Sequence, residues 1–192
     1  MTERVADRRT ELLDAAVRVF AEKGFHATRV GDIAAEAGVA HGLLYHYFRS
    51  KEEVLDTVFR DTWSALVEET RRIEESDAPL HEQLRLFARI YLGSWVATPD
   101  LVRVLVREVA RGPEVGTRVA EIGELFDLLR RIVENGQARG EVRQDVDATI
   151  AAWALYGAHE EILTGWVIGG LPADVDKAVS TVVEIAYRGL AA

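Results

Sequence analysis

Residues 30–49 read VGDIAAEAGVAHGLLYHYFR. Apolar residues recur along this stretch at the spacing of two short helices that pack on each other, with Ala34 where the helices cross and Gly38 in the turn. The apolar positions are Val30, Ile33, Ala37, Val39, Leu44 and Tyr47. This pattern predicts a helix-turn-helix, a motif that presents the outer face of its second helix to the major groove of DNA. A plain helical corner, which alanine and glycine also favour, is the alternative interpretation.

Helical periodicity extends from this motif to the rest of the chain. Apolar spacing and polar breaks predict helices over residues 8–23, about 29–37, about 40–47, about 51–75, 79–97, 99–111, 113–138, 146–168 and 172–189. Gly24 would end the first helix, Thr28 would cap the second and Ser50 would cap the fourth. Glycine breaks are expected at Gly136, Gly140, Gly169 and Gly170, and a helix start at each of Pro79, Pro99, Pro113 and Pro172. The sequence therefore predicts an all-α fold of about nine helices.

The composition excludes several classes of protein. Of the 192 residues, 48% are hydrophobic and 29% are charged, which is typical of a globular chain. Cysteine is absent, so disulfides, thiolate metal sites and cysteine nucleophiles are excluded. The sequence lacks an apolar run of about 18 residues or more, and Met1-Thr2-Glu3-Arg4 does not begin a signal core. These features predict a cytoplasmic protein without a membrane span.

The charge is distributed unevenly along the chain. The net charge is −9, which by itself argues against nucleic acid binding. Residues 1–60 nevertheless hold 9 basic against 10 acidic side chains, and the remainder holds 14 against 22. A nearly neutral N-terminal third on an acidic body is compatible with local contact to DNA.

Residues 28–39 and 42–55 resemble the DNA-binding domain of the TetR family, and the resemblance extends over residues 8–55. It implies a helix-turn-helix DNA-binding domain over residues 1–50 and a helical effector-binding and dimerisation domain over residues 51–192. It also implies a ligand-responsive transcriptional regulator, usually a repressor, that binds a palindromic operator in double-stranded DNA as a homodimer. No metal, other cofactor or enzymatic activity is implied.

The same resemblance implies which residues contact the operator. Tyr45 is similar to an aromatic residue that reaches a phosphate, and Lys51 to a lysine that binds phosphate where the fourth helix begins. The full set of expected contact residues is Thr28, Arg29, His41, Gly42, Leu43, Tyr45, His46 and Lys51. Two residues depart from the family pattern, since Ala40 replaces a common capping serine and Leu43 a frequent threonine. The operator sequence therefore cannot be read from this chain.

The last two predicted helices suggest self-association. The helix over 146–168 is apolar nearly all round, and a chain of this size has little interior in which to bury it. Pairing with a two-fold copy would form a four-helix bundle, whereas ordinary core packing is the alternative. The candidate interface residues are Leu155, Ala158, Ile162, Val175, Val179, Val182, Val183 and Ala186.

Aromatic residues spread over several helices suggest an effector pocket, although helical packing could also use them. They are Trp63, Phe87, Tyr91, Trp95, Phe126, Trp153 and Tyr156. Arg103 and Arg107, followed by Arg111, recur every fourth residue, and form either a solvated face or a strip that binds an anionic ligand. Residues 138–143 and 156–167 are similar to the C-terminal half of TetR-family fatty-acid-metabolism repressors, which implies a long-chain acyl-CoA as the small-molecule effector.

Two other functions compete with a regulator. An enzyme would need a recognisable catalytic pattern, and the sequence lacks a GxSxG motif, a P-loop, a dinucleotide fingerprint and metal-ligand spacing. A helical ligand-binding protein without DNA binding is favoured by the net charge alone. Steep salt dependence of binding to palindromic DNA would separate a regulator from both.

Overall fold

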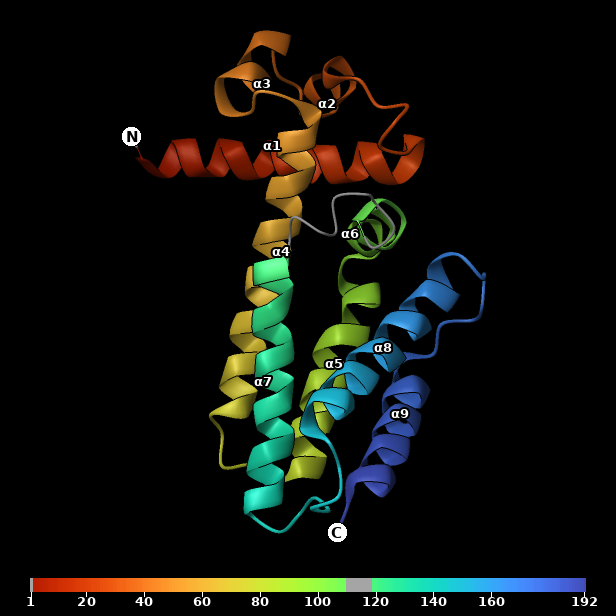
Figure 1. Cartoon of the computed structure of the whole chain (residues 1–192). Helices are drawn as coiled ribbons and strands as arrows, with labels where there is room; N and C mark the ends of the chain where they lie inside the picture. The colour runs from red at the N-terminus through yellow and green to blue at the C-terminus, as the bar shows by residue number, and fades with distance from the viewer. Residues whose placement is uncertain (1, 110–118) are drawn as a thin grey trace. The chain divides into compact units, whose positions relative to one another are not determined.

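The structure of the protein, a computed structural model, describes residues 2–109 and 119–192 (Figure 1). These residues are helical apart from turns, loops and one isolated bridge between Val142 and Ala191, which confirms the predicted all-α fold. In this part of the chain the helices form two compact units, residues 2–62 with 98–109 and residues 63–97 with 119–192. The first unit thus includes the start of the fourth helix, whereas the sequence-based boundary lies after residue 50.

The first unit contains the helix-turn-helix. Its elements are α1 (Thr2–Lys23), α2 (Val30–Glu36), α3 (His41–Tyr47), the first half of α4 (Lys51–Glu74), α6 (Pro99–Val104) and the π-helix η1 (Leu105–Val109). Helix α1 packs against α2 and α6, and α2 packs against α3. The core between these helices holds fully buried apolar side chains, among them Leu12, Phe20, Ile33, Leu44 and Phe48. The predicted motif is therefore confirmed, with its apolar residues directed inward.

Two glycines shape the connections in this unit. Gly24 and Gly38 have φ angles of 80° and 64°, in the left-handed region that favours glycine. The first follows α1, and the second lies between α2 and α3, as predicted. The predicted cap of α4 is also confirmed, because the Ser50 hydroxyl accepts the amide N–H of Glu53 at 3.3 Å.

Three predictions for this unit are wrong. Helix α1 begins at Thr2 instead of residue 8, since residues 2–7 extend it although they lie outside the apolar stripe used to place it. Thr28 does not cap α2, because its buried hydroxyl donates to the Gly24 carbonyl at 2.8 Å. Arg29 is the N-cap residue instead, and its amide donates to the Asp32 carboxylate at 2.8 Å. The single helix predicted over 99–111 changes to a π-helix at Leu105.

The second unit contains the rest of α4 and four further helices. They are α5 (Leu80–Ala97), α7 (Val119–Ala138), α8 (Ala148–Val167) and α9 (Val175–Leu190). Helix α5 packs against α9, and α7 packs against α8 (Figure 1). Fully buried side chains from α5 and α7 form the centre of this core: Leu80, Phe87, Leu92, Leu125, Leu128, Leu129 and Ile132.

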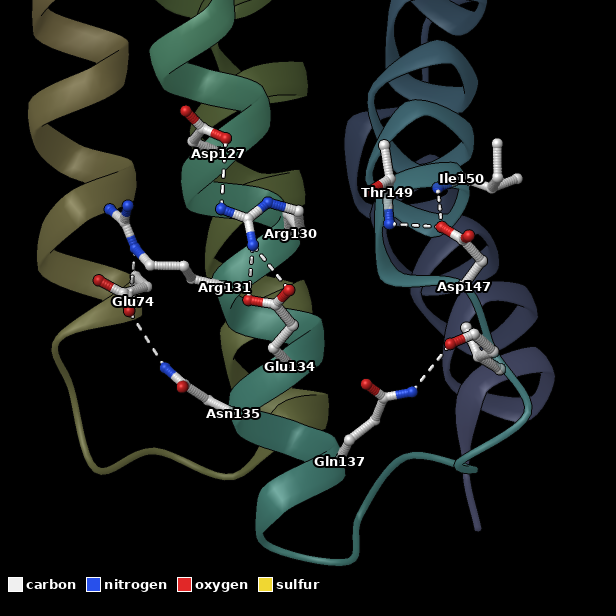
Figure 2. A network of polar contacts seen from close by, with 11 residues as sticks. Glu74, Asp127, Arg130, Arg131, Glu134, Asn135, Gln137, Asp147, Thr149 and Ile150 are labelled. Atoms are coloured by element: carbon white, nitrogen blue, oxygen red, sulfur yellow. Dashed lines mark hydrogen bonds and ion pairs between the residues drawn. The ribbon is translucent and has the colours of Figure 1, made fainter.

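Polar contacts hold the ends of α4, α7 and α8 (Figure 2). The Glu74 carboxylate in the last turn of α4 accepts a hydrogen bond of 3.1 Å from the Asn135 amide of α7. Gln137 donates to the Val146 carbonyl at 2.8 Å, which fixes the connection to α8. Asp147 then caps α8 by accepting two amide N–H groups, from Thr149 at 2.9 Å and Ile150 at 3.0 Å.

Further predictions are corrected in the second unit. Pro172 does not open the last helix, which begins at Val175 after the Asp174 side chain accepts the Lys177 amide at 3.0 Å. Gly136 does not break α7, and its lack of a side chain instead allows a close approach, since a Cβ there would lie 2.7 Å from a Val142 methyl carbon. The start of the helix predicted from residue 113 lies outside the described residues. None of the helices that the structure describes combines the length and apolar character needed to cross a membrane.

Candidate DNA-binding surface and effector site

The outer face of α3 carries most of the residues expected to read bases. Tyr45 is 52% exposed, and His41, Gly42 and His46 are also exposed. Leu43 is half-buried, whereas Leu44 on the opposite face is fully buried in the core of the unit. This separation leaves the polar rim of α3 accessible to a ligand. The residues expected to contact bases are therefore available, and their contact with DNA stays a prediction.

Neighbouring side chains and backbone orient the two aromatic rings at the start of α3. The rings of His41 and Tyr45 meet edge to face, with their centroids 5.5 Å apart. A Cβ atom at Gly31 in α2 would lie 3.3 Å from the His41 Nδ1 atom. Glycine at this position therefore allows the His41 ring to pack over α2.

Lys51 is bound to the loop between α1 and α2. Its ammonium group donates to the backbone carbonyls of Phe25, His26 and Thr28 at 2.8, 3.2 and 3.0 Å. It also lies 4.6 Å from the centroid of the Phe25 ring. A lysine ammonium has three donors, and all three are directed to the protein itself. Lys51 thus ties the loop between α1 and α2 to α4 in the free protein, and its contact with a phosphate stays a prediction.

Two arginines near α3 remain available to an anion. Arg29 at the start of α2 is exposed, as expected for a backbone contact. Arg49, directly after α3, is also exposed, and its backbone amide donates to the Glu53 carboxylate at 2.6 Å. Arg49 is not among the predicted contact residues, although a basic residue just beyond a recognition helix was a signal for it. The Thr28 side chain, by contrast, is buried in the free protein, and its contact with DNA stays a prediction.

Six of the expected effector residues form one aromatic cluster in the second unit. Tyr156 lies at its centre, with ring centroids 5.7 Å from Tyr91, 5.1 Å from Phe126 and 6.2 Å from Trp63. Trp153 stacks on Phe126 at 4.0 Å, and Phe87 lies 5.8 Å from Tyr91. The cluster thus brings together residues of α4, α5, α7 and α8. The structure thus brings these six side chains together, and their contact with an effector stays a prediction.

Several polar side chains lie next to one another in this aromatic cluster. The Tyr91 hydroxyl donates to the Glu160 carboxylate at 2.6 Å. Burial, together with the nearby Glu160 charge, raises the pKa of Tyr156 to about 12 and the pKa of Tyr91 well above its usual range. His159 is buried beside them, and its ring lies 5.0 Å from Phe87. His159 and Glu160 are not among the predicted effector residues, although two ionisable residues within an apolar helix were a signal for them.

Three other expected effector residues lie elsewhere. The Trp95 ring contacts Trp166, which is not a member of the aromatic cluster, with ring centroids 6.5 Å apart. Arg103 and Arg107 belong to the first unit, where they line a surface cavity of about 480 Å³. The Arg103 guanidinium there donates to Asp100 at 2.6 Å, so the expected anion-binding strip is balanced by carboxylates. Arg111 lies outside the described residues.

Helices α8 and α9 share an exposed apolar surface. Ile150, Trp153 and Ile185 are 66%, 58% and 69% exposed, although each is large and apolar. A groove of about 430 Å³ runs between the two helices. Its apolar lining includes Ile150, Ala154, Ala158, Val182, Ile185 and Gly189. Apolar surface of this kind on a globular unit marks a contact site for another molecule.

The predicted interface residues divide between this surface and the core. Leu155, Ala158, Val182 and Ala186 line the groove, although Leu155 and Val182 are themselves largely buried. Val179 and Val183 are buried within the chain, because α9 packs this stripe inward. Ile162 and Val175 are half-buried. Ile185 and Gly189 of α9 also line the groove but were not predicted, although Val182 and Ala186 beside them were.

Comparison with known proteins assigns both parts of the chain. Residues 12–58 match the model of bacterial regulatory proteins of the tetR family, and residues 59–189 match that of the YsiA-like protein C-terminal region. The fatty acid metabolism regulator protein of Bacillus subtilis is 28% identical over 182 residues, which cover 94% of each chain. The HTH-type transcriptional repressor KstR2 of Rhodococcus jostii is 32% identical over 187 residues, which cover 96% of this chain and 91% of the repressor.

Solved structures show the same fold. FadR of Bacillus subtilis, in complex with stearoyl-CoA, superposes with a TM-score of 0.82 at 26% identity, covering 94% of this chain and 98% of that protein. The fatty acid degradation regulator FadR of Bacillus halodurans superposes with a TM-score of 0.84 at 27% identity, covering 94% of each chain. The helix-turn-helix, the helical second unit and these matches lead to one assignment. The chain belongs to the TetR family of bacterial regulatory proteins.

Proposed function

We propose that this protein is a cytoplasmic transcriptional repressor that binds a palindromic operator as a homodimer and is released from it by an acyl-CoA. The proposal rests mainly on the two faces of α3: His41, Tyr45 and His46 are exposed on the outer face, and Leu44 is buried on the opposite face. A short helix with a polar outer face and a firmly packed inner face is suited to the major groove.

Direct contacts to DNA come from two groups of residues in this proposal. His41, Gly42 and Tyr45 contact base edges or nearby phosphates from α3, and Leu43 meets a thymine methyl group. Arg29 and Arg49 contact the phosphate backbone on either side. Their positive charges offset the acidic character of the chain where it meets DNA.

A homodimer forms in this proposal through α8 and α9. The exposed Ile150 and Ile185, and the small residues of the groove between the helices, support a surface that packs on its own copy. Because a two-fold axis pairs the same patch on both subunits, each buried side chain contributes twice. Two heads related by this axis then read two half-sites of a palindrome.

The effector binds among the aromatic side chains of the second unit. Support comes from the Tyr91, Phe126 and Tyr156 cluster and from the relatives, which include a FadR solved with stearoyl-CoA. Helix α4 runs from the first unit into the second, so a ligand that shifts it changes the position of the head. Typical coupling of about 1–3 kcal/mol would weaken operator binding about 5- to 150-fold.

Selection of bound DNA from a random pool tests this function. The full-length protein is expected to enrich a palindrome, and stearoyl-CoA is expected to release the enriched DNA. Enrichment of no sequence would contradict the regulator, whereas enrichment without release would contradict the acyl-CoA effector and leave the regulator standing.

A further inference from the structure

One buried polar atom in the aromatic cluster lacks a partner. Of the buried side-chain nitrogen and oxygen atoms in the described part of the chain, His159 Nε2 is the one without a hydrogen bond. The side chain is only 3% exposed. A buried polar atom without a hydrogen bond lowers the stability of the fold, so the absence of a partner needs an explanation.

The other nitrogen of the ring determines what this atom needs. His159 Nδ1 lies 2.6 Å from the Leu155 carbonyl oxygen, which can only accept. Nδ1 therefore carries the proton, and in the neutral ring Nε2 presents a lone pair. Burial lowers the pKa of His159 and so keeps the ring neutral. The missing partner is thus a hydrogen-bond donor.

The neighbouring hydroxyl groups do not supply that donor. The Tyr91 hydroxyl is donated to Glu160 at 2.6 Å. The Tyr156 ring packs on Tyr91 at 5.7 Å, and the nearby Glu160 charge contributes, after burial, to the raised pKa of Tyr156. The remaining ring in contact with His159 is Phe87, which has no polar atom. The rings in contact with His159 are therefore apolar or have their hydroxyl already engaged.

We infer that the effector donates a hydrogen bond to His159 Nε2. This inference rests on the proposed effector site and narrows its ligand to an acyl derivative with an O–H or N–H group that reaches α8. A saturated alkyl chain cannot provide that group. Two sources can: a hydroxyl on the acyl group itself, or an amide N–H of the pantetheine arm that every acyl-CoA carries.

Matched probes and two substitutions test the inference. The affinity of the full-length protein is measured for stearoyl-CoA and for hydroxystearoyl-CoA compounds with the hydroxyl at successive carbons. The same series is measured with His159→Phe, which keeps a flat ring between Phe87 and Tyr91 but removes the acceptor. His159→Gln is the matched control, because its amide oxygen can take the place of Nε2. Near-ultraviolet circular dichroism checks that both variants keep their packing.

If an acyl hydroxyl is the donor, the wild type should bind one hydroxylated probe roughly 10-fold more tightly than stearoyl-CoA. His159→Phe should abolish this preference, whereas His159→Gln should retain it. If a pantetheine amide is the donor, the wild type should bind all probes with equal affinity. His159→Phe should then lower the affinity for every probe by roughly 10-fold. Unchanged affinities in a folded His159→Phe protein would overturn the inference and leave the effector proposal intact. Binding of no probe to the wild type would overturn the acyl-CoA proposal and this inference with it.

Discussion

The ammonium group of Lys51 donates to the carbonyl oxygen of Phe25 at 2.8 Å and lies 4.6 Å from the centroid of the same residue's ring. Two further carbonyls of the same loop accept its remaining protons. The first residue of α4 therefore closes the loop that precedes α2. This gives Lys51 a structural role in the helix-turn-helix, which the following variants separate from phosphate binding.

Lys51→Met is expected to lower the free energy of unfolding by about 1–3 kcal/mol, because three carbonyls lose a charged donor. The salt dependence of operator binding should keep its slope in the folded variant. Chemical denaturation and binding titrations at several salt concentrations measure both quantities. A reduced slope at unchanged stability would instead assign Lys51 to a phosphate.

Arg49→Gln should behave in the opposite way. Its exposed side chain contributes little to stability, within about 0.5 kcal/mol. If Arg49 contacts a phosphate, the magnitude of the salt slope falls by about 1 in the variant. The same titrations provide the comparison, with Lys51→Met as the matched basic-residue control.

Tyr45→Ala should weaken operator binding by about 1–3 kcal/mol without lowering stability, because the side chain is 52% exposed on the outer face of α3. Tyr45→Phe distinguishes the two forms of contact. A hydroxyl bound to phosphate predicts that the phenylalanine variant loses affinity as well, whereas contact through the ring predicts that it does not. Equal affinity of wild type and Tyr45→Ala in a gel-shift titration would remove Tyr45 from the interface.

Ile185→Glu should dissociate the proposed dimer. The side chain is 69% exposed and lines the groove between α8 and α9, so each subunit would bring an unpaired carboxylate into the interface. Thr181→Glu adds the same charge at an exposed position of α9 outside the groove lining and serves as control. Sedimentation equilibrium should give monomers for the first variant and dimers for the second. Dimers of unchanged affinity in both would place the interface elsewhere.

Glu141 caps the start of α5 from the connection between α7 and α8. Its carboxylate accepts the Leu80 amide at 2.6 Å, and this bond, followed by the Arg139 guanidinium, lowers the pKa of Glu141 below 4.5. A lowered pKa means that the stabilisation is present above pH 4.5 and is lost as the pH falls through the folded-state value. Glu141→Ala should cost about 0.5–2 kcal/mol at neutral pH.

Urea denaturation of wild type and Glu141→Ala at neutral and acidic pH measures this effect. The difference in unfolding free energy should shrink as the carboxylate is protonated. Glu141→Gln, which keeps an oxygen acceptor without the charge, should show a smaller loss that also shrinks at acidic pH, because the wild-type carboxylate loses its charge there. A loss in Glu141→Ala that stays constant across the pH range would mean that the cap does not depend on the ionised carboxylate.

His159 should make the protein less stable in mild acid. Burial holds the pKa of His159 below 6.5 in the folded protein, so the unfolded chain takes up a proton first as the pH falls through 6.5. Wild-type stability should then fall by up to about 1.4 kcal/mol per pH unit from this residue alone. The His159→Phe variant should lack this component in urea denaturation. Parallel pH profiles of the two proteins would mean that His159 is protonated equally in both states.

Local features of this protein follow from residues close together in the chain. The turns at Gly24 and Gly38, the Ser50 cap and the inward face of α3 were all predictable. Each depends on backbone conformation or on side chains within one or two helical turns. The family pattern lies in this same local segment, and for that reason the DNA-binding unit could be recognised without coordinates.

The partner of a side chain, by contrast, depends on elements distant in sequence. Lys51 meets a carbonyl 26 positions earlier, and Tyr91 meets Glu160 69 positions later. The apolar stripe containing Val179 and Val183 could face α5 or a second subunit with the same periodicity, and packing against α5 buried it. Periodicity specifies which side chains share a helix face, but which neighbour covers that face depends on how all the helices fill one core.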